Sequence, residues 1–99
     1  MRINYRISEK AIEDLENVWL YTLESWSVEQ ADRYYNLLIE EIKYLSGHFE
    51  SGKSMEHIKQ GYRASKVKSH LIFYKKAKDN IVEIVRILHQ RMDIENRLK

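Results

Sequence analysis

Apolar residues alternate with polar ones at the start of the chain and then recur every three or four positions. Ile3, Tyr5 and Ile7 alternate with polar neighbours, which predicts a short strand from Ile3 to Ile7. Ser8 follows in the position of a helix N-cap, with the acidic Glu9 in the first turn. The predicted buried stripe of this first helix consists of Ile12, Leu15, Trp19, Leu23 and Trp26.

A second helix is predicted directly after the first. Ser27 and Gln30 match a capping box, so this helix should begin at Val28, and Gly47 is suited to the position just after its end. Its predicted buried stripe consists of Ala31, Tyr35, Leu38, Ile42 and Leu45. Because so few residues separate the two helices, they should form an antiparallel hairpin.

The second half of the chain has the pattern of strands. Residues 47–57 show no regular period and should form a loop. The predicted strands cover residues 58–65, 70–74 and 81–88, and the predicted turns cover 66–69 and 75–80. The tail, residues 92–99, has no pattern that decides between a short helix and a disordered segment.

The resulting order, β-α-α-β-β-β, predicts an α+β fold with an N-terminal helical hairpin packed on one face of a small antiparallel sheet. No linker or repeat interrupts the chain, so residues 1–99 should form a single domain. Cysteine is absent, which excludes disulfides, and no apolar run is long enough to span a membrane. The first residues do not resemble a signal peptide, so we expect a soluble cytoplasmic protein with no membrane partner.

Charge is divided unevenly between the two halves. Residues 1–50 carry a net charge of −5 and residues 51–99 a net charge of +7, giving +2 for the whole chain. The cations that fall near the predicted sheet, together with two histidines, are Arg63, Lys66, Lys68, His70, Arg86, His89 and Arg91. Such a cluster is compatible with RNA phosphate binding and cleavage, with binding of an acidic peptide, and with a merely solvated surface.

Motifs for cofactor chemistry are absent from the sequence. The four histidines have no metal-ligand spacing, and no nucleotide-binding or serine-hydrolase motif occurs, so we expect no cofactor, no metal and no catalytic residue. Tyr34, Leu37 and Tyr44 fall off the buried stripe of the second helix. They predict an exposed apolar edge that a partner helix would cover.

Three stretches of the second half resemble a known family in order and spacing. They are Gly61-Tyr62-Arg63, Ser69-His70-Leu71-Ile72-Phe73-Tyr74, and Arg86-Ile87-Leu88-His89-Gln90-Arg91-Met92-Asp93. Together they resemble the ParE branch of the RelE/ParE toxin superfamily, whose element order is also β-α-α-β-β-β. This resemblance implies the toxin of a bacterial type II toxin–antitoxin module, of the kind that stabilises plasmids.

Toxins of this branch act on DNA gyrase and stall it with its DNA cleaved. The resemblance also implies neutralisation by a ParD-like antitoxin, with which the toxin forms a hetero-oligomer that binds operator DNA through the antitoxin. The residues expected to contact gyrase are Arg63, Arg86, His89, Arg91, Met92 and Asp93, with the tail. The residues expected to contact the antitoxin are Trp19, Tyr34, Leu37, Tyr44, Tyr62, Lys66 and Tyr74.

Two alternatives remain open at this point. The RelE branch cleaves messenger RNA on the ribosome and has an arginine in the strand that is here His70 to Tyr74, and an arginine and a tyrosine after the last strand. This chain has no arginine in that strand and no tyrosine beyond Tyr74, which favours the gyrase poison over the ribonuclease. The other alternative is a non-toxic relative that only binds an antitoxin.

Overall fold

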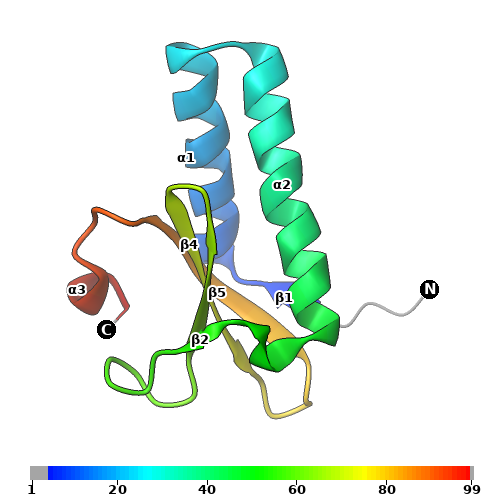
Figure 1. Ribbon diagram of the computed structural model, residues 1–99, viewed down its shortest axis with the longest axis vertical. Coiled ribbons are helices and arrows are strands. Elements are labelled where there is room, and N and C mark those ends of the chain that lie inside the picture. The colour runs from blue at the N-terminus through cyan, green and yellow to red at the C-terminus, as the bar shows by residue number, and fades with distance from the viewer. Residues whose placement is uncertain (1–4, 99) are drawn as a thin grey trace.

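The computed structural model describes residues 5–98 (Figure 1). Its elements are β1 (Tyr5–Ile7), α1 (Glu9–Ser25), α2 (Val28–Gly47), the 3-10 helix η1 (Phe49–Ser51), β2 (Lys53–Ser54), β3 (Arg63–Val67), β4 (His70–Lys76), β5 (Val82–His89) and α3 (Ile94–Leu98). Two helices followed by a sheet confirm the α+β class and the helical hairpin. Residues 3 and 4 of the predicted first strand lie outside the described residues.

The sheet has five strands in the order β1-β5-β4-β3-β2. All neighbouring pairs are antiparallel except β1 and β5, which are parallel, with Tyr5 opposite Val82 and Ile7 opposite Ile84. The expected wholly antiparallel sheet is therefore corrected at this edge. A parallel pair requires a long crossover connection, and here the hairpin and the β3–β4 meander together provide it.

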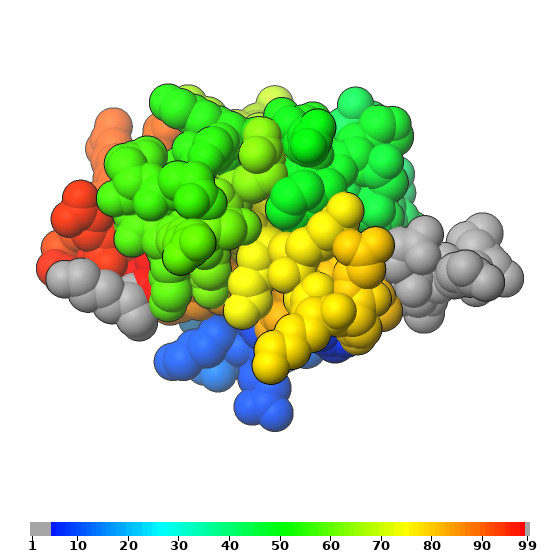
Figure 2. Space-filling view, turned by 90° about the horizontal axis from the view of Figure 1, so that it is seen from below, coloured from blue at the N-terminus to red at the C-terminus, as the bar shows by residue number. Residues whose placement is uncertain are grey.

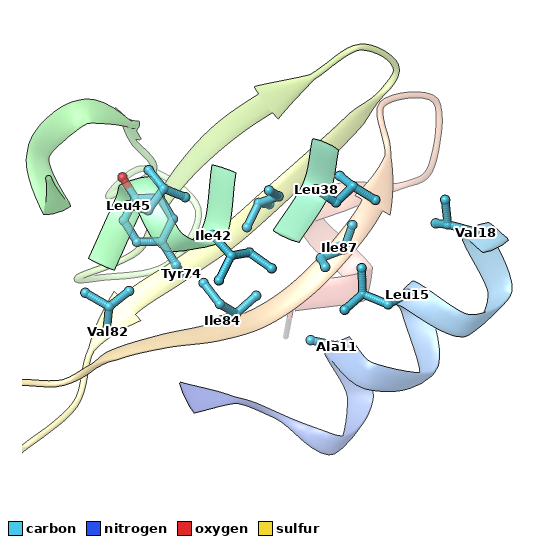
Figure 3. Close-up of a cluster of buried hydrophobic side chains, with 11 residues drawn as sticks. Ala11, Leu15, Val18, Leu38, Ile42, Leu45, Tyr74, Val82, Ile84 and Ile87 are labelled. Atoms are coloured by element: carbon cyan, nitrogen blue, oxygen red, sulfur yellow. The ribbon is translucent and has the colours of Figure 1, made fainter. Parts of the chain in front are cut away.

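The main core lies between the hairpin and one face of the sheet (Figure 3). Helix α2 buries Ala31, Leu38, Ile42 and Leu45 as predicted, whereas α1 buries Ala11, Leu15 and Val18. The predicted stripe of α1 is wrong at two positions, since Ile12 is 45% exposed and Trp26 is 75% exposed. Leu15 is buried as predicted, and Trp19 and Leu23 are half-buried. Small side chains face the sheet because they allow the helix to approach it closely, and the larger residues are left at its sides.

A β-bulge in β5 decides which residues of this strand enter the main core. Tyr74 pairs with Ile84 but Phe73 pairs with Arg86, so Val85 is the extra residue. The bulge changes the alternation of the strand, and Ile87 therefore joins Ile84 on the hairpin side in place of Arg86.

A second, smaller core lies on the other face of the sheet. Phe73 and Leu88 of the sheet are buried there against Tyr62, from the segment 55–62, and Leu98, from α3. Figure 2, seen from below, shows this segment in green beside the turn after β4 in yellow, with α3 in red at the edge.

Two predicted boundaries are wrong around this second core. The predicted strand over 58–65 begins only at Arg63, because residues 55–62 close on themselves through the Met55 N–H bond to the Tyr62 carbonyl (2.8 Å). Gly61, with φ +82°, permits that turn. The expected loop contains β2, and Gly47 is the last residue of α2, with His48 as the cap.

The tail of the chain is a helix rather than a disordered segment. In α3, Leu98 is buried, and Lys59 Nζ donates to the Leu98 carbonyl at 2.8 Å. The tail therefore belongs to the fold, although Lys99 lies outside the described residues.

Candidate partner-binding groove

A groove of about 1110 Å³ runs between the hairpin, the β3–β4 turn, the end of β5 and α3. Its walls come from both halves of the chain, so the acidic and basic halves meet there. The lining includes the apolar side chains Val18, Tyr21, Trp26, Tyr34, Leu37, Ile87 and Met92, the cations Lys10, Arg33, Lys68, Arg86 and Arg97, and the acids Glu13 and Asp14.

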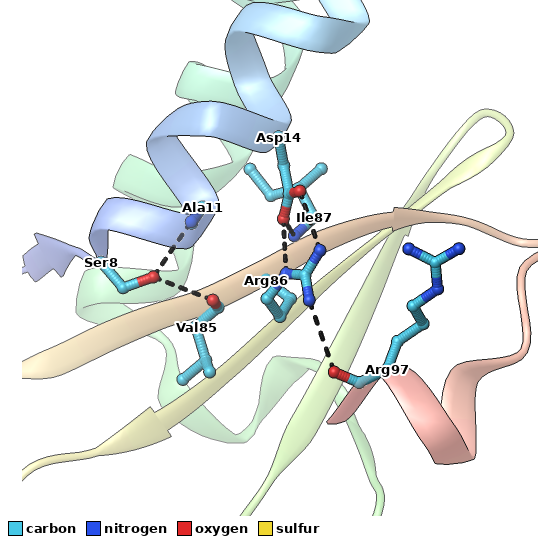
Figure 4. Close-up of polar contacts among 7 residues, drawn as sticks. All are labelled: Ser8, Ala11, Asp14, Val85, Arg86, Ile87 and Arg97. Carbon is cyan, nitrogen blue, oxygen red and sulfur yellow. Dashed lines mark hydrogen bonds and ion pairs between the residues drawn. The ribbon is translucent and has the colours of Figure 1, made fainter. Parts of the chain in front are cut away.

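The ion pair between Asp14 and Arg86 forms part of the groove wall (Figure 4). Arg86 Nε and Nη2 donate to the two carboxylate oxygens of Asp14 at 2.9 and 3.0 Å, and the Ile87 N–H donates to the same carboxylate at 2.9 Å. The hydrogen bonds that Arg86 donates to the Asp14 carboxylate raise the pKa of Arg86, against a smaller opposing effect of burial. Because Arg86 is held by Asp14, it is not a free cation for a partner.

Near this ion pair, Ser8 joins the start of α1 to the bulge of β5. Its hydroxyl accepts the Ala11 N–H at 3.0 Å as the predicted N-cap and donates to the Val85 carbonyl at 2.9 Å (Figure 4). The Ser8 N–H donates to the Ile84 carbonyl at 3.0 Å. These bonds tie the start of the hairpin to β5.

Two histidines and a tyrosine gather where the groove meets the β3–β4 turn. Tyr34 Oη donates to the Val67 carbonyl at 3.1 Å and lies 2.6 Å from His70 Nδ1, which therefore donates to it. The rings of His70 and His89 lie edge to face with centroids 5.2 Å apart, and His89 Nδ1 accepts the Arg91 N–H at 3.1 Å. Burial, and then the proximity of His89, lowers the pKa of His70 to about 4, so His70 is neutral at physiological pH.

Large apolar side chains are exposed to solvent in the groove, which is uncommon for residues gathered in one patch on a protein surface. Tyr21 is 71% exposed, and Trp26, Leu37 and Met92 are exposed beside it. With cations at the rim, the groove has the composition of a surface that binds an apolar segment bearing acidic residues.

The residues expected to contact gyrase divide into two groups. Arg91, Met92 and Asp93 lie exposed in the connection between β5 and α3, next to His89. Arg63 lies elsewhere: its Nε and Nη2 donate to the Gly52 carbonyl at 3.0 and 2.7 Å, so it holds the chain before β2. Arg86 is also bonded within the fold, so Arg63 and Arg86 do not belong to a cluster of free cations on the sheet.

The residues expected to contact the antitoxin are also divided. Tyr34 and Leu37 line the groove, and Tyr44 and Lys66 are exposed outside it. Trp19 lies on the other side of the hairpin. Tyr62 and Tyr74 are buried, so the structure contradicts their assignment as surface contacts. The Tyr74 hydroxyl instead donates to the Phe49 carbonyl at 2.7 Å and accepts the Gly52 N–H at 2.8 Å.

Comparison with known proteins identifies the family. Residues 5–94 match the family described as the ParE toxin of type II toxin–antitoxin systems, parDE. The chain belongs to the ParE toxin family. Membership implies an antitoxin partner, because ParE toxins belong to two-component ParDE systems.

Relatives with similar sequences include other ParE toxins over almost their whole length. Toxin ParE1 of Mycobacterium tuberculosis is 34% identical over 98 residues, which cover 99% of this chain and 100% of the relative. Toxin ParE1 of Caulobacter vibrioides is 37% identical over 94 residues, which cover 95% and 96% of the two chains. A solved structure described as the chromosomal ParDE TA system from P. aeruginosa shares the fold, with a TM-score of 0.76 at 18% identity over 88% of this chain and 95% of that one.

Three groove residues of this ParE chain were missed from the sequence. Asp14 adjoins the buried Leu15, and Arg86 stands between apolar residues of the predicted last strand, so the sequence offers a reason to look for a partner of each. Tyr21 had no such signal, because it lies off every apolar stripe. The spacing of α1 predicts that Trp26 is buried, but this residue caps the end of α1 and is 75% exposed. Among residues 5–98, no helix is long and apolar enough to cross a membrane.

Proposed function

We propose that this ParE-family toxin inhibits DNA gyrase by stabilising the cleaved gyrase–DNA complex, and that a ParD-like antitoxin neutralises it by filling the groove. The observation that carries the antitoxin half of this proposal is the row of exposed apolar side chains, Tyr21, Trp26 and Leu37, beside the rim cations Arg33 and Lys68. An acidic, apolar antitoxin segment would cover the former and pair with the latter. The gyrase half rests on family membership.

The proposal includes the setting in which the protein acts. Gyrase and its DNA are cytoplasmic in bacteria, so the toxin acts in the cytoplasm. In the hetero-oligomer, operator DNA is bound through the antitoxin, and the toxin itself reaches the operator only indirectly. We infer that the module stabilises the replicon that encodes it.

The histidine cluster supports a binding poison over a ribonuclease. A pKa of about 4 makes His70 a weak general base near neutral pH. His89 Nδ1 accepts the Arg91 N–H, so this ring nitrogen is occupied within the fold. Neither histidine is therefore prepared for acid–base cleavage of RNA, and Arg86 is held by Asp14 rather than directed at a phosphate.

We place the gyrase contact on His89, Arg91, Met92 and Asp93. His89 is the half-buried last residue of β5, and Arg91, Met92 and Asp93 lie exposed in the connection that follows it. The Met92 N–H donates to the His89 carbonyl at 3.0 Å and so shapes the backbone of this connection. Arg63 and Arg86 are left out of this contact because their guanidinium groups are occupied within the fold.

The experiment that tests this function adds the purified chain, released from its antitoxin, to DNA gyrase with relaxed and supercoiled plasmid. Loss of supercoiling together with accumulation of cleaved plasmid is the expected result. Arg91→Glu should reduce both effects, whereas Lys78→Glu, the same charge change on the exposed β4–β5 turn, should not. Full gyrase activity at a large excess of toxin would overturn the proposal.

The alternatives are separated by two further assays. Cleavage of messenger RNA on programmed ribosomes, with gyrase unaffected, would indicate the RelE-type activity. Absence of growth arrest on induction, with antitoxin binding retained, would indicate a non-toxic relative.

A further inference from the structure

A second pocket, of about 460 Å³, lies between α1 and α2 on the side of the hairpin turned away from the groove. It is lined by Glu16, Trp19, Leu20, Asp32 and Tyr35. At 100° per residue, these positions lie on the opposite side of each helix from the groove residues. The two cavities share no lining residue.

The walls of this pocket are aromatic and its polar groups are anionic. Trp19 Nε1 donates to Asp32 Oδ1 at 2.9 Å, which fixes the indole and leaves Oδ2 of Asp32 available. No basic residue lines the pocket, and within residues 5–98 neither Glu16 nor Asp32 forms an ion pair. Two aromatic side chains and two unpaired carboxylates form an environment that favours a cation.

The surface around the pocket is apolar as well as acidic. Ile12, Leu20 and Val28 are 45%, 47% and 50% exposed, and they lie on the same side of the hairpin as the pocket. A bound inorganic ion would leave these side chains in water, whereas a protein segment would cover them. The net charge of −5 on residues 1–50 repels nucleic acid and attracts a basic segment.

We propose that this pocket receives an arginine side chain from a basic, apolar segment of a partner protein. Arginine fits better than lysine because its planar guanidinium stacks on aromatic rings while donating to carboxylates at its edge. The site is independent of the groove, so it can be occupied whether or not an antitoxin segment fills the groove.

The test titrates the full-length chain with an acetylated leucine–arginine–leucine amide and follows the Trp19 indole N–H by NMR. Trp26→Phe assigns the two indole signals. The control peptide replaces arginine with citrulline, which has nearly the same shape but no charge. The arginine peptide should shift the Trp19 signal and bind about five- to tenfold more tightly than the citrulline peptide.

Asp32→Asn is the decisive variant, because its amide oxygen still accepts the indole N–H while the charge is lost. It should remove most of the preference for arginine. Glu24→Gln makes the same charge change at an exposed position that does not line the pocket, and should retain the preference. Equal binding of both peptides, or an unaltered preference in Asp32→Asn, would overturn the proposal. A concentration-dependent Trp19 shift without peptide would instead assign this face to a second copy of the chain. None of these readouts depends on gyrase.

Discussion

Asp14 and Arg86 join the first helix to the last strand just beyond the point where β1 ends. The last β1 residue, Ile7, pairs with Ile84, so the edge of β5 beyond that residue has no neighbouring strand. Asp14 supplies the missing acceptor by taking the Ile87 N–H and the Nε and Nη2 donors of Arg86. One carboxylate thus closes a sheet edge and forms a wall of the groove.

Arg86→Ala should destabilise the fold by about 2–3 kcal/mol, because the largely buried Asp14 carboxylate would lose its charged partner. Urea denaturation measures the change in the free energy of unfolding. Arg91→Ala, an exposed arginine, should change stability by less than about 0.5 kcal/mol. If Arg86→Ala were as stable as Arg91→Ala, the ion pair would not have the structural role assigned to it.

The sequence predicted the order of elements and the faces of α2, because these depend on periodicity and capping within one segment. It does not predict the buried face of α1. The predicted stripe through Ile12 and Trp26 and the observed stripe through Ala11 and Val18 both have intervals of three and four residues. The choice between those stripes depends on how closely the helix approaches the sheet. The bulge at Val85 is not predictable from the sequence either, because its position depends on the register in which β5 pairs with β4.

The candidate site was only partly predictable for the same reason. The spacing of α2 places Leu37 and Tyr34 off the buried stripe, and both residues line the groove. The sequence predicts surface contacts for Arg63 and Tyr74, because it does not reveal their intramolecular partners. Both side chains are bonded to the backbone of Gly52.

Gly52→Ala should destabilise the protein by about 2 kcal/mol or more, because an added Cβ would lie 2.3 Å from Tyr74 Oη and 2.8 Å from the Ala64 carbonyl oxygen. Gly47→Ala is the matched control: nothing lies within 4 Å of its Cβ, and alanine favours the helix that it ends. The midpoint of thermal denaturation should be lower for Gly52→Ala than for the unaltered chain, and it should be unchanged or higher for Gly47→Ala. A neutral Gly52→Ala would show that the Tyr74 contact is easily displaced.

Stability should decrease as pH falls from about 6.5 to about 4 through His70. Its folded pKa is about 4 against an ordinary 6.5, so the unfolded chain binds a proton in this range that the native protein does not. The effect should be roughly 1–2 kcal/mol, less than the full shift implies, because the ring is partly open to solvent.

Urea midpoints at about pH 7 and about pH 5 should therefore differ less in His70→Gln than in the unaltered chain. His57→Gln, the same substitution at an exposed histidine, is the matched control. Identical pH dependence in all three proteins would exclude His70 as its source.

Removal of the tail should unfold the smaller core rather than delete a separate binding segment. Leu98→Ala should cost about 2–3 kcal/mol, because Leu98 packs in the same cluster as Phe73 and Leu88. A deletion of residues 92–99 would therefore lose both growth inhibition and antitoxin binding through instability. Melting followed by circular dichroism compares the midpoint of Leu98→Ala with that of the control Glu95→Ala, which changes an exposed residue. Equal midpoints would show that the tail contributes to binding and not to stability.

Leu37→Glu should weaken antitoxin binding by about 30-fold or more, because it places a carboxylate on the apolar wall that the antitoxin segment is proposed to cover. Leu20→Glu is the matched control, since the residue has a similar exposure but lies on the opposite side of the hairpin. Calorimetric titration of each variant with the cognate antitoxin gives the two affinities, and denaturation midpoints confirm that both variants are folded. If Leu20→Glu weakened binding as much as Leu37→Glu, the antitoxin would cover both sides of the hairpin rather than the groove alone.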